Sequence, residues 1–147
     1  MVRDLTVYGH KGNNRFISPT IRFFIVRRNL CDVLIKLDRN IRFVGIVNNK
    51  GEVIEGGFQE GVEPLLQDSE EQEMYINSLS NMALFQNFSD RLGKVKYSLT
   101  EHQKIALMSF PLDNGILCLS VYVKDTNVDQ LKNAILKIMS TRTKTIN

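Results

Sequence analysis

The sequence predicts one α/β domain of the α+β type, a three-layer α/β/α sandwich around a five-stranded antiparallel sheet. Three observations predict it. The elements follow the order αββαβββα, three strand-like segments are almost wholly apolar, and two others are weaker or alternate. A chain of 147 residues, 43% hydrophobic and 24% charged, can bury one core without disulfides or a structural metal.

Eight elements are expected. In chain order they are a helix at 28–38, strands at 41–47 and 52–55, a helix from Ser69 to about Arg91, strands at 94–100, 105–110 and 116–123, and a helix from Val128 to about residue 140.

Local signals support the first helix and hairpin. Leucines spaced four and three apart mark residues 28–38 as an amphipathic helix. A β-branched run at 41–47 precedes the turn residues Asn48–Gly51, a pattern typical of a hairpin. We expect Gly56 and Gly57 to end its second strand, because glycine allows the unusual backbone dihedral angles that a strand end can need.

The later elements have their own start and stop signals. Ser69 through Gln72 has the form of a capping box, which predicts a helix start, and Gly93 is expected to end that helix. Asp113–Gly115 should join two apolar strands as a tight hairpin. Asp125–Asn127 should open the last helix.

The apolar gradient among the strands predicts the sheet order 2-1-5-4-3. The almost continuously apolar strands at 41–47, 105–110 and 116–123 belong in the middle. The weaker strand at 52–55 and the alternating strand at 94–100 belong at the edges. This order keeps both hairpins adjacent, and helices must then cover both faces of the sheet.

The predicted domain spans 27–140 and has two flanking segments. Residues 1–26 are interpreted as an N-terminal appendage, either flexible or docked through Ile21–Val26 as an extra strand, and 141–147 as a polar tail. The apolar run at 16–26 is short and interrupted by polar residues, so it predicts neither a membrane span nor a secretory signal. We therefore expect a cytoplasmic protein with no membrane partner.

Charge is distributed unevenly. The net charge of +3 combines +5 over residues 1–28 with −2 over the remainder, so the domain proper is slightly acidic.

Cys31 and Cys118 have no close cysteine or histidine neighbours. They are interpreted as buried free thiols of a reducing compartment.

Two segments carry a family resemblance. Phe43–Gly57, with the sequence FVGIVNNKGEVIEGG, resembles the opening hairpin of the roadblock (dynein light chain type) family. Leu117–Asn127, running into an amphipathic helix, is similar to that family's last strand and closing helix. Residues 30–140 also look like a set of small uncharacterised archaeal proteins of this roadblock-like, profilin-like class. The resemblance implies homodimers or heterodimers, joined through the third strand and second helix. Such dimers scaffold or regulate small GTPases and carry no catalytic residues of their own.

The expected edge strand is the candidate homodimer interface, because its unpaired backbone groups invite a second strand. Self-pairing across a twofold axis lets one strand supply both halves of the interface. Lys94 and Lys96 would instead act as gatekeepers if the edge stays unpaired. The candidate interface residues are Val95, Tyr97 and Leu99 on one strand face, with Leu79, Met82 and Phe85 from the preceding helix. Core packing within the monomer is the alternative role for the helical residues.

Residues 51–90 contain nine acids and no lysine or arginine. Solvation and helix capping account for much of this, and a docking surface for a basic partner is the functional alternative. The candidate surface comprises Glu60, Glu63, Asp68, Glu70 and Glu71. The sequence has no calcium loop, phosphate loop, nucleophile elbow or zinc-binding helix, so we expect no metal, cofactor or catalysis.

Three functional hypotheses remain open. The leading one is a non-catalytic, dimeric interaction module that scaffolds or regulates a protein partner such as a small Ras-like GTPase. The second is a small-molecule sensory domain with the same sheet order, which requires a cavity between the central sheet and the second helix. The third is nucleic-acid binding through the basic N-terminus, which the acidic domain opposes.

Overall fold

The computed structural model describes residues 30–146, with side chains to residue 141. The interpretation of residues 1–26 as an appendage, the docking of Ile21–Val26 and nucleic-acid binding through the basic N-terminus therefore lie outside the described residues.

The described elements follow the predicted order. They are a helix at residues 30–35, β1 (Ile41–Asn48), β2 (Val53–Phe58), α3 (Asp68–Gln86), the short α4 (Ser89–Leu92), β3 (Ser98–Glu101), β4 (Ile105–Leu112), β5 (Gly115–Tyr122) and α5 (Val128–Ile146). All neighbouring strands are antiparallel, and the sheet order is β2-β1-β5-β4-β3. The predicted fold class and strand order are confirmed.

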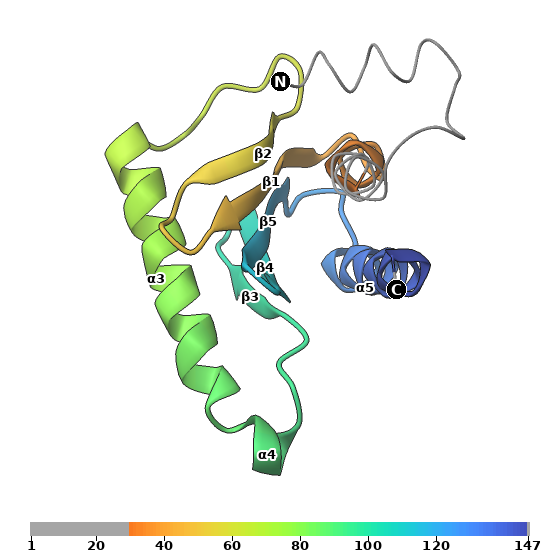
Figure 1. Ribbon diagram of the computed structural model, residues 1–147. Helices are drawn as coiled ribbons and strands as arrows, with labels where there is room; N and C mark the ends of the chain where they lie inside the picture. The colour runs from red at the N-terminus through yellow and green to blue at the C-terminus, as the bar shows by residue number, and fades with distance from the viewer. Residues whose placement is uncertain (1–29, 147) are drawn as a thin grey trace, which may run out of the picture.

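Helices cover both faces of the sheet (Figure 1). The helix at 30–35 and α5 lie on one face, and α3 lies on the other. The core on the α5 side is the larger one and includes Leu34, Ile41, Met108, Phe110 and Ile135. The core under α3 consists of Phe43, Val47, Tyr75, Met82, Ile116 and Cys118. The thinner packing under α3 is what leaves space on that face.

β2 runs longer than expected. Gly56 and Gly57 do not end it, because the strand continues to Phe58. Gly56 lies opposite Gly45 at a φ of +85°, and a Cβ there would run into the carbonyl of Val44. Gly56 therefore allows β1 and β2 to approach closely, and the expectation of a strand end was wrong.

α3 also begins and ends differently. It starts at Asp68, and the backbone N–H of Gln67 donates to Glu70 Oε1 at 2.8 Å. The capping interaction thus lies two residues before the predicted box. The helix breaks after Gln86 and resumes briefly as α4, which Gly93 ends at a φ of +87°.

α5 begins as predicted but is longer. Asn127 Oδ1 accepts a hydrogen bond from the backbone N–H of Gln130 at 3.0 Å, which is the expected helix cap. The helix then continues to Ile146. Its extension includes most of the predicted polar tail, because that segment contains neither glycine nor proline to stop it.

β3 is much shorter than the predicted strand at 94–100. Only Ser98–Glu101 pairs with β4, and Leu99 lies opposite Met108. α3 and α4 carry the chain past this edge of the sheet (Figure 1). Residues 93–97 therefore return the chain toward β4 and cannot take part in the ladder.

Candidate interaction site and cleft

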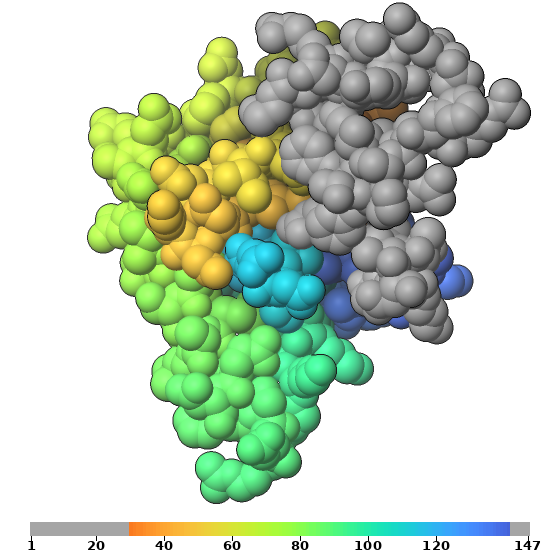
Figure 2. Space-filling model, viewed as in Figure 1, coloured from red at the N-terminus to blue at the C-terminus, as the bar shows by residue number. Residues whose placement is uncertain are grey.

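The C-terminal end of α3 and the whole of α4 project past the sheet as a separate lobe, which we call the overhang (Figure 2). Three large apolar side chains are exposed on it: Leu84 at 51%, Phe85 at 49% and Leu92 at 79%. A helix of 19 residues is about 28 Å long. The sheet does not extend along the full length of α3 (Figure 1), which leaves these apolar side chains exposed.

The six predicted interface residues do not share one surface. Met82 is buried in the core under α3, and Leu79 and Val95 pack against it half-buried. Phe85 and Leu99 are exposed. These two are therefore the members that a second protein could contact directly.

Tyr97 lies on the opposite side from Val95. Its ring packs against the α5-side core, 6.2 Å from the ring centroid of Phe110. Lys132 Nζ of α5 lies 5.0 Å from the centroid of the Tyr97 ring. The expected common face fails because residues 95 and 97 do not belong to a regular strand.

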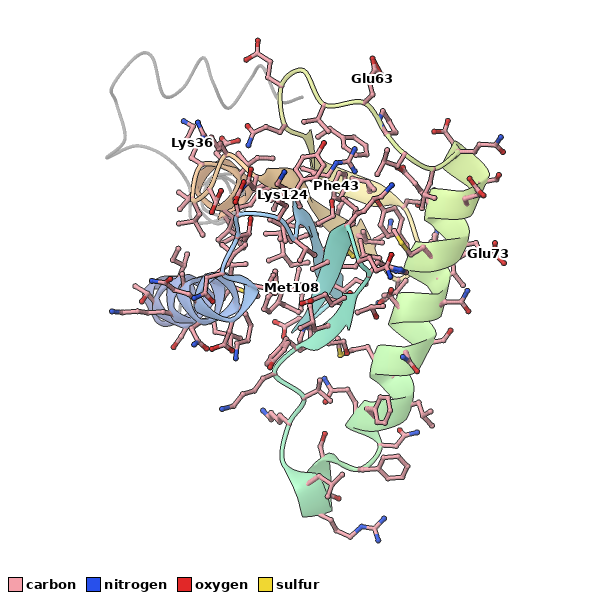
Figure 3. The ribbon with its side chains drawn as sticks, turned by 180° about the vertical axis from the view of Figure 1, so that it is seen from behind. Lys36, Phe43, Glu63, Glu73, Met108 and Lys124 are labelled. Carbon is pink, nitrogen blue, oxygen red and sulfur yellow. The ribbon has the colours of Figure 1, made fainter. Side chains whose placement is uncertain are left out.

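A cleft of about 970 Å³ lies between α3 and the sheet, and we call it the α3 cleft. Its apolar lining includes Phe43, Phe58, Met74, Tyr75, Ile105 and Leu107. Figure 3 shows Phe43 between the sheet and α3, with Met108 pointing from β4 toward α5. The cavity that the sensory hypothesis requires is therefore present.

The charge of the α3 cleft is opposite to that of its surroundings. Arg42, His102 and Lys104 line it, whereas no aspartate or glutamate of the described residues does. α3 itself carries acids and no lysine or arginine. Glu73, for example, points away from the sheet (Figure 3).

Arg42 is the most unusual residue of the cleft. It is only 4% exposed, and its Cζ lies 5.2 Å from the ring centroid of Tyr122. Nη2 donates to the carbonyl oxygen of Glu63 at 2.6 Å, but the buried Nε has no hydrogen-bond partner. In the described part of the chain, no carboxylate forms an ion pair with it.

Sequence reasoning missed Arg42, although a signal was present. It is the one charged residue within the apolar run at 41–47. Charged side chains are almost never buried without a partner. A cation inside a predicted central strand could therefore have been flagged.

The predicted acidic surface lies along the loop between β2 and α3 and the first turn of α3. Glu60, Glu63, Asp68 and Glu70 are exposed, and Glu70 also makes the capping interaction described above. Glu71 is half-buried. Burial raises its pKa, Asp68 raises it further, and the Arg42 charge opposes the shift.

The acidic loop is held to the sheet at its start. Gln59 Nε2 donates to the carbonyl oxygens of Ile35 at 3.0 Å and Ile41 at 3.3 Å. The backbone N–H of Gln59 donates to the carbonyl of Arg42 at 2.7 Å. These bonds, together with the Arg42–Glu63 contact, fix where the exposed acids lie.

Both cysteines are buried thiols, as predicted. Burial raises the pKa of the Cys118 thiol to about 12, although a hydrogen bond with Ser109 opposes the shift.

Within the described residues, no three histidine, cysteine or acidic side chains are grouped so that they could hold a metal ion. None of the described helices has the length and apolarity needed to cross a membrane.

The sequence comparison identifies one family. The sequence model of a family described as "Family of unknown function (DUF6659)" matches residues 8–144. No curated protein sequence matches the chain.

Three solved structures illustrate the structural likeness. The gliding protein MglB from Thermus thermophilus is 14% identical, with a TM-score of 0.58, 89% of this chain covered and 92% of that one. A Roadblock/LC7 domain from Streptomyces avermitilis is 13% identical, with a TM-score of 0.54, 82% of this chain covered and 98% of that one. MglB of Myxococcus xanthus is 16% identical, with a TM-score of 0.50, 78% of this chain covered and 94% of that one. The roadblock-like fold expected from the sequence is confirmed.

Proposed function

This chain belongs to the DUF6659 family, and from that premise and its roadblock-like fold we propose that it is a non-catalytic, dimeric interaction module. It acts as a scaffold or regulator of a protein partner in the cytoplasm. The two buried cysteine thiols support a reducing compartment.

The overhang is the observation that carries the proposal. Leu84, Phe85 and Leu92 expose apolar surface that this chain's own sheet cannot cover. A second copy related by a twofold axis would bring the same lobe against it, because a twofold interface uses one patch twice. Burial of this surface stabilises the pair by removing apolar area from water.

The β3 edge supports the same arrangement. Among the described strands, β3 pairs only with β4, so its other side offers unpaired backbone groups. The exposed Leu99 lies on this strand. Pairing of β3 with its symmetry copy would extend the sheet across both copies, next to the overhang.

Sedimentation velocity of the full chain over a range of micromolar concentrations tests the dimer. We expect a sedimentation coefficient that rises with concentration toward the dimer value. A species that remains monomeric throughout this range overturns the dimeric part of the proposal.

A small Ras-like GTPase is the partner implied by the roadblock resemblance. The exposed acids Glu60 and Glu63, on a loop fixed to the sheet, favour a partner with a basic docking face. Capture from the native host is therefore compared between the wild-type chain and a Glu60→Lys/Glu63→Lys variant. Recovery of a GTPase by the wild type and its loss with the variant is expected. If the wild-type chain and the variant retain a GTPase equally, its docking site does not include Glu60 and Glu63.

A small-molecule sensory domain is the second candidate function. The α3 cleft of about 970 Å³ favours it, because ligand clefts in proteins typically measure about 300–1,000 Å³. A thermal-shift screen of small molecules tests it. Absence of any stabilising compound counts against this function and leaves the dimer proposal unaffected.

A further inference from the structure

We propose that the α3 cleft binds a small organic anion, a carboxylate or phosphate carried by an apolar body, with its charged group beside Arg42. This inference rests on the second candidate function. It adds the chemical class of the ligand and the end of the cleft where its charge lies.

The first argument is the missing counter-charge of Arg42. The side chain is 4% exposed, its Nε has no hydrogen-bond partner, and no described carboxylate pairs with it. A guanidinium taken out of water without an anion is costly, and native proteins pair such charges. Carboxylates and phosphates are the anions that match the planar donors of arginine.

Glu71 does not serve as that counter-ion. Its carboxyl group feels the Arg42 charge, but the two form no ion pair. A carboxylate paired with a buried guanidinium would have a lowered pKa. Burial and Asp68 instead raise the pKa of Glu71. The positive charge of Arg42 is therefore left for a ligand.

The second argument is a second cation, Lys104, in the lining of the same cleft. Lys104 and His102 lie in the turn between β3 and β4, and both line the cleft with Arg42. Ile105, the next residue after Lys104, pairs with Tyr122, whose ring lies under the guanidinium. No aspartate or glutamate of the described residues lines the cleft, so Arg42 and Lys104 are the charges that an anion meets along its wall.

The third argument concerns the rest of the ligand. Phe43, Phe58, Met74 and Leu107 line the same cleft as Arg42. Such a wall favours an apolar body, because burial of apolar groups against it removes their surface from water. A simple inorganic anion would leave this apolar wall uncovered.

Arg42 itself lies away from the proposed dimer edge. Arg42 lies on β1, which is separated from β3 by β5 and β4. Three strand spacings of about 4.8 Å place it roughly 14 Å inward from the β3 edge. A second copy paired at β3 and a ligand beside Arg42 therefore occupy different parts of the molecule.

Isothermal titration calorimetry of the full chain with octanoate, octyl phosphate and 1-octanol tests the inference. We expect both anions to bind more tightly than the alcohol, and comparison of the two anions distinguishes carboxylate from phosphate. Arg42→Gln should weaken anion binding by roughly tenfold or more and leave 1-octanol unaffected. Lys137→Gln removes an exposed charge of α5 and is the matched control, for which no change is expected.

The outcomes separate this inference from the function on which it rests. Equal binding of octanoate and 1-octanol supports a ligand cleft but overturns the anion site. Binding of none of the three probes overturns the anion site, whereas another compound found in the screen would still support a sensory domain. Anion binding that survives Arg42→Gln unchanged also overturns the role of Arg42.

A second readout uses the wild-type chain alone, in case Arg42→Gln does not fold. Met74 lines the cleft, whereas Met139 packs on the α5 side of the sheet. Octanoate should shift the NMR signal of the Met74 methyl group and leave that of Met139 in place. Shifts of both signals, or of neither, contradict binding in this cleft.

Discussion

Truncation of Phe85 should weaken the proposed dimer without harming the monomer. The side chain is 49% exposed in the single chain, so its removal leaves no large cavity in the core. Its position on the overhang places it where a second copy would contact this chain. Phe85→Ala therefore tests the interface rather than the fold.

The magnitude follows from the exposed area. An aromatic side chain offers about 150–250 Å², so nearly half of Phe85 amounts to about 100 Å². At about 25 cal/mol per Å², covering it contributes about 2.5 kcal/mol per copy, or about 5 kcal/mol for the two copies of a dimer. Even one-third of that value raises the dissociation constant more than tenfold.

Sedimentation equilibrium measures the dissociation constant of the wild type, Phe85→Ala and a matched control. Ile54→Ala is that control, because Ile54 is 53% exposed but lies on β2, the opposite edge of the sheet. Circular dichroism should show all three chains equally folded. A dissociation constant for Phe85→Ala within about twofold of the wild type, or an equal loss in Ile54→Ala, refutes the overhang as the interface.

Two further predictions concern the core under α3. In Gly45→Ala the new Cβ would lie 2.6 Å from Phe43 Cζ, so urea unfolding should show a loss of about 1–3 kcal/mol, and wild-type stability would contradict this packing. Cys118 has a folded pKa of about 12 against an ordinary value of 9.0, so its contribution to stability is complete below pH 9.0 and is lost as pH rises toward about 12. The unfolding free energy of the wild type should therefore fall by up to about 1.4 kcal/mol per pH unit above pH 9.0. Cys118→Ala should be flatter between pH 9 and 10, and an identical slope would show that the thiol is not buried as described.

The candidate site was only partly accessible to sequence reasoning. The exposed acids Glu60 and Glu63 follow from composition, and the exposure of Phe85 agrees with a helix face in contact with a partner. The prediction that Val95 and Tyr97 share one face was wrong, because alternating residues lie on one face only where the backbone forms a paired strand. The sequence could not predict whether the α3 cleft exists; it showed only that the sensory hypothesis needs a cavity there. The volume of the cleft depends on how α3 lies against the sheet.

The sequence by itself determined the element order, the strand order and the burial of both cysteines. Periodicity, turn residues and the apolar gradient are properties of neighbouring residues, and they specify which segments are central and which are edges. Only the tertiary structure decided how far β2 extends and how short β3 is. These depend on contacts between distant segments, such as Gly56 against Val44. The same long-range packing leaves Arg42 buried beside an open cleft and leaves Phe85 beyond the end of the sheet.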